Sequence, residues 1–341
     1  MAARSKVAKT TIIDIAAASG VSVATVSRIL NNKPDVADET RERVLRVMNE
    51  IGFAPQSAWR QIRLGRTGLI AVHRPEQFNP PAYGIVTAAA LAVEEAGYSI
   101  NIVTRTLSDA ELLGIFRSRQ ADGIILLEIQ PDDRRAEILR DHGYPFVMVG
   151  RRAENAGLSF ADMDIEHGIT EAMEHLLSLG HRQIGLLTID PVAGEKVHGF
   201  AMWALNSYRE ACANAGIQPI VVMTEPTSEA ATAAAARMLD ASREVTAVIA
   251  PQEHSVIGIL KVCYARGIVI PRDLSLVAVL REGLSDLATP PLTAITFPVD
   301  DLGRTAGRLL TERLGGGPSV PPRQVLLRPE LVIRGTTAAP H

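Results

Sequence analysis

The sequence of 341 residues predicts a small all-α domain followed by an α/β core of two doubly wound parallel-sheet subdomains. Apolar residues recur at helical spacing through the first 50 or so residues. From Thr67 onward, short apolar runs alternate with helix-like segments, as in parallel sheets that are buried on both faces. The charge also changes there: residues 1–66 hold 11 basic and 6 acidic side chains, whereas the remainder holds 24 and 32. A basic head on an acidic body is typical of a nucleic-acid-binding domain joined to a domain of another kind.

The first predicted helix begins after Thr11 and ends at Gly20. Thr11 can cap the helix, and Asp14 at its third position favours the positive end of the helix dipole. Gly20 stops the helix where a tight turn is needed. The apolar face of this helix consists of Ile12, Ile15 and Ala16.

A second helix is predicted to follow the turn, capped by Ser22. Its apolar positions have helical spacing and are Val23, Val26, Ile29 and Leu30. Two short helices joined by a glycine-containing turn predict a helix-turn-helix, whose second helix places its first residues at the base edges in the DNA major groove. The residues expected there are Ser22, Val23, Ala24, Thr25, Ser27 and Arg28. The alternative is an ordinary core hairpin, which rarely needs so polar a second helix.

A third helix is predicted from Asp38 to Ile51, and Gly52 and Pro55 prevent its continuation. Its apolar stripe consists of Val44, Leu45, Val47 and Met48.

Beyond Thr67 the predicted strands are separated by helices such as 85–96, 169–179 and 230–241. The strands are expected at residues 68–72, 99–103, 123–127, 146–149, 183–187, 220–223, 247–250 and 275–279. The segment Gly315–Ser319 is expected to be a flexible surface loop and not a phosphate cradle, because no strand-to-helix context surrounds it.

Several classes of protein are disfavoured by the composition. No stretch has the apolar length of a membrane span and no signal peptide opens the chain, so a cytoplasmic protein without membrane contact is expected. Cys212 and Cys263 are the only cysteines and are expected to be reduced, buried thiols.

There is no nucleophile elbow, P-loop or zinc-ligand spacing, so neither enzymatic activity nor a metal or other cofactor is expected. His181, just beyond a predicted helix, is expected to be a polar cap.

The residues of the first two helices also carry a family resemblance. Thr11–Asn32 resembles the opening of the lactose-repressor/galactose-repressor (LacI/GalR) family of bacterial regulators at almost every fixed position. The likeness continues through 38–44, 51–55, 180–182 and 328–334, and so covers nearly the whole chain.

The resemblance implies a periplasmic-binding-protein-like core and a set of domain boundaries. These are a head over 1–52, a hinge helix or linker over 53–66 and an effector-binding, dimerising core over 67–341. Within the core, one subdomain is expected over about 67–164 and 295–325, and the other over about 165–294 and 326–341. The chain is expected to cross between them near Ile165, Ala294 and Leu326.

In this family the hinge orders on the operator, and a Leu wedges into the minor groove. Here Gln56 replaces the usual Asn, Trp59 replaces a usual Ala, and Ile62 stands where the wedge is expected. Ile62 is apolar and suited to the wedge, although branching at Cβ stiffens it. Trp59 either strengthens the packing between two hinges or stacks on sugar and phosphate. The resemblance therefore adds to the expected DNA contacts Thr11, Asn31, Gln56, Trp59, Arg60 and Ile62.

A small-molecule effector is expected between the subdomains. The expected lining consists of Arg74, Asn79, Asp164, Lys196, Gln252, Glu253 and Arg281, with His254 beside them. Lys196 belongs to this set if the family's Arg-x-x-Gly-Tyr motif aligns through Gly199 and Phe200. If Tyr208 takes the Tyr position, the Arg maps to Ala204 instead.

Several of the family's sugar-binding groups are missing from this lining. Pro81 and Ala82 replace paired aromatics, Ile165 replaces an Asn, and Leu280 replaces a carboxylate. Unpaired buried polar groups cost ~1–3 kcal/mol each, so a common hexose is not assumed. The pocket either binds a less hydroxylated or differently charged ligand, or it is vestigial.

The sequence thus predicts a dimeric, sequence-specific transcriptional regulator, a repressor on a palindromic operator of double-stranded DNA, modulated by a carbohydrate or other metabolite. A dimer and a tetramer both remain open. One rival is a solute-binding protein or cleft enzyme of the same core fold, which has no use for residues 1–66. Another is an effector-independent protein that binds DNA without sequence preference.

Overall fold

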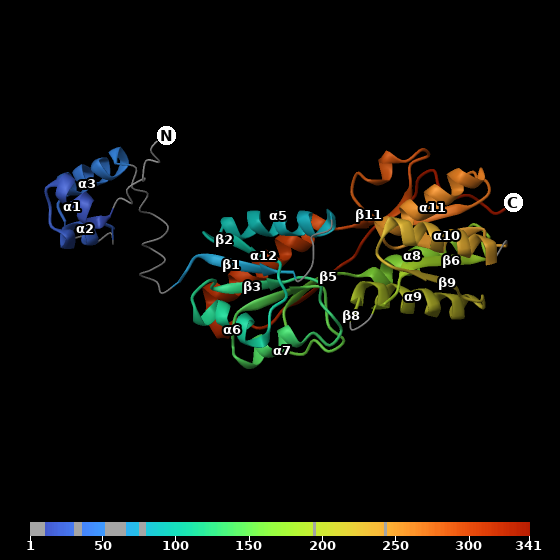
Figure 1. Ribbon diagram of the computed structural model, residues 1–341, viewed down its shortest axis with the longest axis horizontal. Helices are drawn as coiled ribbons and strands as arrows, with labels where there is room; N and C mark the ends of the chain where they lie inside the picture. Colours follow the sequence, from blue (N-terminus) through green and yellow to red (C-terminus); the bar gives the residue numbers. More distant parts are fainter. Residues whose placement is uncertain (1–10, 31–35, 52–65, 75–79, 194–195, 242–243) are drawn as a thin grey trace, which may run out of the picture.

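The computed structural model describes residues 11–30, 36–51, 66–74, 80–193, 196–241 and 244–341. Within these ranges three short helices come first, and two α/β lobes follow (Figure 1). Among the described residues no single helix is long and apolar enough to span a membrane, and α1 with α2 meets that test only as a bent pair.

The head consists of α1 (Ile12–Ser19), α2 (Val23–Leu30) and α3 (Asp38–Glu50). α1 ends at Gly20, whose φ of 68° is left-handed backbone that glycine adopts without strain. α1 and α2 meet at 101°, an angle typical of the helix-turn-helix. The predicted motif is confirmed.

A small apolar core holds the three helices together. Ile15, Val26, Val44 and Met48 are buried in it with Ala16 and Ile29. The predicted stripe of α3 is wrong at Leu45, which is 45% exposed because it lies one residue beyond Val44 on the outer side of the helix. This core turns the remaining surface of α2 outward.

Lobe one is built on a parallel sheet in the order β13-β5-β4-β3-β1-β2. Alternate residues of β1 face opposite helix layers: Ile70 and Val72 pack with α5 and α12, whereas Ala71 packs with α6 and α7. The elements of lobe one are β1 (Leu69–His73), α5 (Pro80–Glu94), β2 (Ser99–Val103), α6 (Asp109–Arg117), β3 (Gly123–Leu126), α7 (Arg134–Asp141), β4 (Phe146–Val149), β5 (Phe160–Met163), α12 (Val299–Gly316), η2 (Gly317–Ser319) and β13 (Gln324–Leu327).

Lobe two has a second sheet in the order β14-β12-β11-β10-β6-β9, in which only β14 is antiparallel. α8 and α9 pack on one face, and α10 and α11 pack on the other. The elements of lobe two are α8 (Ile165–Ser178), β6 (Ile184–Ile189), the hairpin β7 (Val192–Ala193) and β8 (Lys196–Val197), α9 (Gly199–Ala215), β9 (Ile220–Thr224), α10 (Ser228–Ala241), β10 (Ala247–Ala250), α11 (Glu253–Arg266), β11 (Ser275–Arg281), η1 (Ser285–Leu287), β12 (Thr293–Phe297) and β14 (Leu331–Val332).

The predicted fold class is confirmed, and all eight predicted strands are present. The expectation of a loop over Gly315–Ser319 is wrong. Gly315 and Gly316 form the last turn of α12, where the Gly317 N–H donates to Arg313 O, and a 3₁₀ turn follows. Glycine in a final helical turn is tolerated because few helical bonds depend on it.

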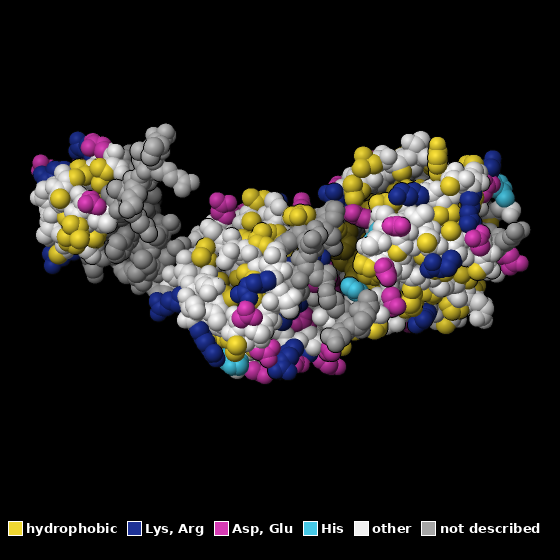
Figure 2. Space-filling model, viewed as in Figure 1, with side chains coloured by type: hydrophobic (Ala, Val, Ile, Leu, Met, Phe, Trp, Pro, Cys, Tyr) yellow, Lys and Arg dark blue, Asp and Glu magenta, His cyan; other side chains and the backbone are white. Residues whose placement is uncertain are grey.

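The chain passes between the lobes three times, directly after β5, after β12 and after β13. Each crossing leaves from the carboxyl end of a strand, so the carboxyl edges of the two sheets face each other. The second and third crossings lie a few residues after Ala294 and Leu326, which sit inside β12 and β13. Figure 2 shows the surface hollowed between the lobes.

Candidate nucleic-acid interface and inter-lobe site

Side-chain caps shape both helices of the helix-turn-helix. Thr11 and Asp14 form a reciprocal capping box at the start of α1, and the hydrogen bonds from Thr11 lower the pKa of Asp14. At the start of α2 the Thr25 N–H donates to Ser22 Oγ at 3.0 Å, and the two hydroxyl oxygens are 2.9 Å apart. These bonds set the path of the backbone that enters α2.

The start of α2 presents a mixed apolar and polar surface. Val23 is 43% exposed and Ala24 is exposed beside it. Arg28, one helical turn beyond Ala24, is also exposed. Thr25 and Ser27, which lie between them in the sequence, are half-buried. A side chain such as Val23, apolar and exposed on a head this small, suits contact with a thymine methyl group in the major groove.

The other expected DNA contacts lie outside the described residues. They are Asn31, Gln56, Trp59, Arg60 and Ile62. The first described residues after them are held to lobe one. The Thr67 and Gly68 N–H groups both donate to the Asp122 carboxylate at 2.7 Å, and Arg66 donates to Leu314 O at 2.8 Å. A displacement of lobe one therefore moves the end of the linker with it.

On the lobe-one side of the inter-lobe site, the buried Arg74 forms an ion pair with a partly exposed carboxylate. Arg74 directly follows β1, and its guanidinium is 2.8 Å from the carboxylate of Glu128, which follows β3. Glu128 has a φ of 53°, an uncommon left-handed backbone for this residue type. The sequence predicted Arg74 but missed Glu128, although Glu128 directly follows the predicted strand 123–127.

Arg135 supports this corner of lobe one. Its guanidinium donates to Leu127 O and Glu128 O, at 3.0 and 2.9 Å, and pairs with Asp133. His73 at the end of β1 lies 3.3 Å from the same guanidinium. Burial, assisted by Arg135, lowers the pKa of His73 to about 4, so this imidazole is neutral near pH 7.

Two residues expected to bind the effector make structural hydrogen bonds. Asp164 caps α8 by accepting from the His167 N–H at 3.1 Å. Gln252 accepts from the Ile189 N–H at 3.2 Å and donates to Thr188 Oγ1 at 3.1 Å, which ties the start of α11 to the end of β6.

Glu253 and Arg281 face each other at the carboxyl ends of β10 and β11, with the nearest atoms 3.9 Å apart. Burial raises the pKa of Glu253, and Arg281 opposes that shift. The neighbouring His254 has a pKa lowered by burial, and its Nε2 has no hydrogen-bond partner among the residues that the structure describes. Lobe two thus contributes a carboxyl group, a guanidinium and an imidazole to this site.

The remaining effector residues are placed only in part. Lys196 belongs to β8, but its side chain and Asn79 lie outside the described residues. Ala204 is buried in the middle of α9, and Tyr208 donates its hydroxyl to Ile184 O at 2.7 Å, so both belong to the core. Gly199, in contrast, begins α9 against lobe one: a Cβ there would lie 3.3 Å from Ile129 O.

Direct contacts join the lobes around the start of α9. The Val197 N–H donates to Gln130 Oε1 at 3.4 Å. Arg151 of lobe one lies over the Trp203 ring of lobe two, with its guanidinium carbon 5.1 Å from the ring centroid. Arg151 follows the predicted strand 146–149, so its place at a carboxyl edge was the signal in the sequence.

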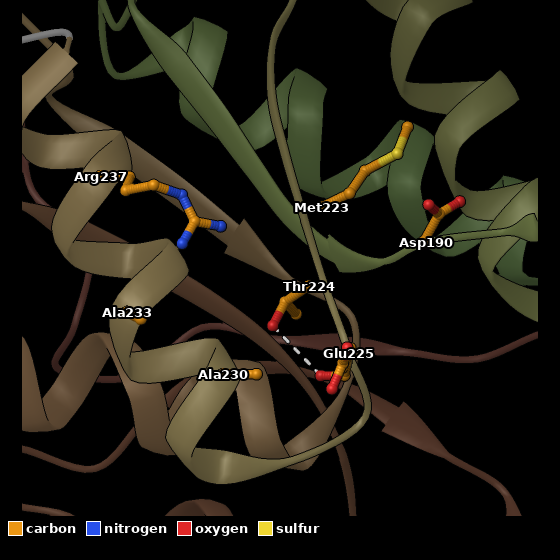
Figure 3. A pocket seen from close by; sticks show the side chains of 7 residues that line it. All are labelled: Asp190, Met223, Thr224, Glu225, Ala230, Ala233 and Arg237. Carbon is orange, nitrogen blue, oxygen red and sulfur yellow. Dashed lines mark hydrogen bonds between the residues drawn. The ribbon is translucent and has the colours of Figure 1, made fainter. Parts of the chain in front are cut away.

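A separate surface pocket of about 400 Å³ lies beside β9 (Figure 3). It is lined by Asp190, Met223, Thr224, Glu225, Ala230, Ala233 and Arg237. None of these residues belongs to the predicted set. In the described part of the chain, no group of three or more His, Cys, Asp or Glu side chains could hold a metal ion.

Comparison with known proteins agrees with this architecture. Residues 11–56 match the family described as bacterial regulatory proteins of the lacI family, and residues 173–337 match a periplasmic binding protein-like domain. The HTH-type transcriptional regulator MalR of Streptomyces coelicolor is 33% identical over 342 residues, which covers 97% of both chains.

Two solved structures resemble the whole chain. The complex of the transcriptional regulator CelR with cellobiose has a TM-score of 0.70 at 27% identity and covers 96% of this chain and 100% of its own. The lac repressor dimer bound to operator and an anti-inducer has a TM-score of 0.84 at 24% identity and covers 97% and 99%. The chain therefore belongs to the lacI family of bacterial regulatory proteins and is a DNA-binding transcriptional regulator, not an enzyme.

Proposed function

We propose that this regulator binds a palindromic operator as a homodimer, represses transcription there, and responds to a small molecule held between its lobes. Residues 1–52 form the DNA-binding head, 53–66 the hinge, and 67–341 the effector-binding and dimerising core. A cytoplasmic location follows from this function, because bacterial operator DNA lies in the cytoplasm.

The observation that carries the proposal is the outward face at the start of α2. Val23 and Ala24 are exposed there and Arg28 is exposed in the last turn, while Val26 and Ile29 of the same helix are buried against α1 and α3. A helix anchored on one side and exposed at its beginning fits the major groove, where an arginine can read guanine and apolar groups can read a thymine methyl. The lac repressor dimer bound to operator supports operator binding by two copies of the chain.

The hinge contributes the second part of operator recognition. We assign the minor-groove wedge to Ile62, with Gln56, Trp59 and Arg60 beside it. A wedge must unstack one base step, which costs a few kcal/mol and is least at flexible pyrimidine–purine steps. The operator is therefore expected to have such a step at its centre.

Selection of bound fragments from random DNA tests the proposal. Two identical heads related by a two-fold axis require an approximate palindrome, so the selected sequences should share inverted half-sites around a central pyrimidine–purine step. Direct repeats or a single asymmetric half-site would contradict binding by a two-fold symmetric dimer. Repeating the selection with a panel of metabolites identifies the effector as the compound that changes recovery of the palindrome.

We place the effector between the facing carboxyl edges of the two sheets. The side chains assigned to it are Arg74, Asn79, Asp164, Lys196, Gln252, Glu253 and Arg281. The ion pairs Arg74–Glu128 and Glu253–Arg281 favour a ligand with charged or strongly polar groups over a neutral hexose. The complex of CelR with cellobiose supports a carbohydrate derivative as the ligand. If no metabolite in the panel changed the recovery of the palindrome, the regulator would instead be effector-independent.

A further inference from the structure

One arginine joins the two lobes at their junction. Arg151 follows β4 of lobe one, and its side chain is only 11% exposed. It forms an ion pair with Glu166 in the first turn of α8, and its guanidinium lies over Trp203 of α9. Both partners belong to lobe two, so Arg151 is a direct link across the boundary.

A second carboxylate competes for the same guanidinium. Asp162 lies in β5 of lobe one, where its side chain is 16% exposed. Its Oδ2 is 3.8 Å from Arg151 Nε, which is longer than a hydrogen bond, and its Oδ1 accepts from the Met163 N–H at 2.9 Å. Arg151 therefore has one acidic partner on each lobe, and in this structure it binds the partner on lobe two.

The two carboxylates, Asp162 and Glu166, differ in their surroundings and in their hydrogen bonds. Burial raises the pKa of Asp162 to about 7, Arg151 opposes the shift, and Glu166 and Asp164 reinforce it. Glu166 uses one oxygen for Arg151, while its Oε2 is buried without a hydrogen-bond partner among the described residues. The two carboxylates therefore compete for one guanidinium, which in this structure is bound to the more exposed Glu166 and not to the more buried Asp162.

We propose that Arg151 is a proton-coupled latch, which holds the lobes together through Glu166 and Trp203 and transfers to Asp162 when the lobes separate. This inference rests on the proposed response to a ligand between the lobes and describes its regulation. In the latched state Asp162 keeps its proton. When Asp162 loses that proton it becomes the stronger partner, and Arg151 then remains within lobe one.

The direction of the pH dependence follows from the groups around Asp162. Arg151 comes from the loop after β4, and Asp164 and Glu166 come from the crossing and α8. α9 places the uncharged Trp203 against Arg151 and the uncharged Ser207 against the Glu166 carbonyl, and β13 places Leu326 opposite Asp162. Because the latched state binds one more proton, lowering the pH below about 7 favours latched lobes and raising it favours separated lobes.

Fluorescence of Trp203 tests the latch without DNA or effector. The chain has two tryptophans, so Trp59→Phe leaves Trp203 as the single reporter. Its emission should change between pH 5.5 and 8.5 with a midpoint near 7, as Arg151 leaves the ring. Asp162→Asn in this background should abolish the change. His167→Gln and His198→Gln should retain it, which excludes the histidines beside Glu166 and α9.

A second variant decides the outcome even if Asp162→Asn does not fold. Glu166→Gln removes the competing charge, so the midpoint should fall by about one pH unit or more. Small-angle scattering should show a larger radius of gyration at pH 8 than at pH 6 in the parent protein. An unchanged midpoint in Glu166→Gln, a transition that persists in Asp162→Asn, or equal radii would overturn the latch. None of these results depends on operator binding, so a failure of the proposed function is recognised separately.

Discussion

Replacing Arg28 with Ala is expected to weaken binding to the selected operator by about 1–3 kcal/mol, roughly 5- to 150-fold, with little change on random DNA. Arg28 is exposed on α2, one turn beyond Ala24, whereas Ile29 and Val26 anchor the helix in the core of the head. An arginine at this place can donate two hydrogen bonds to a guanine, an interaction that random sequence offers only by chance. Titration of labelled operator and random duplexes at one fixed salt concentration measures both affinities.

Arg43→Ala is the matched control for Arg28. Arg43 is an exposed arginine of the same head but lies on α3, away from the start of the recognition helix. Its removal should lower specific and random binding by a similar factor, as loss of a general electrostatic attraction does. If Arg28→Ala also reduced both affinities equally, Arg28 would be only a phosphate contact and base reading would have to come from other residues.

A large loss of stability is expected from Gly303→Ala in lobe one. α12 crosses α5 so closely that a Cβ on Gly303 would lie 2.2 Å from Ile85 O, 2.7 Å from Ala88 Cβ and 2.9 Å from the Ala89 nitrogen. Two of these three atoms are backbone, so the helices must move apart. Overpacking of this kind typically costs ~1–3 kcal/mol or more. Urea unfolding should show a clearly lower midpoint.

Gly315→Ala provides the control on the same helix. A Cβ at Gly315 would meet nothing within 4 Å in the described part of the chain. Alanine is the better helix former by ~0.5–1 kcal/mol, so this variant should be as stable as the parent protein or slightly more stable. Equal unfolding midpoints for the two variants would show that α5 and α12 are not packed as closely as the structure places them.

Local sequence signals predicted the elements with strong periodicity. The capping pair Thr11 and Asp14 and the turn at Gly20 are contacts between near neighbours, and the long apolar runs are strands in both lobes. β5 was not predicted as a strand because Asp162 interrupts its apolar run. β13 was also missed, because it is an edge strand in which only alternate residues are partly buried.

The candidate site was harder to predict because its partners are distant in the chain. Arg74 meets Glu128 only because β1 pairs with β3, which brings His73 beside Leu126. Resemblance identified Gln252 by its position, but the hydrogen bonds to Ile189 and Thr188 become visible only in the folded sheet. Position along a strand is thus encoded locally, whereas pairing across strands and lobes is not.

A competition experiment that compares operator and random-DNA affinity tests whether this protein recognises DNA by its base sequence. A sequence-specific regulator with the exposed α2 surface should bind its selected palindrome at least ~10³-fold more tightly than random duplex at physiological salt. Equal affinities for the two duplexes, with the same dependence on salt, would rule out base-specific reading by α2 and identify a protein that binds DNA without sequence preference.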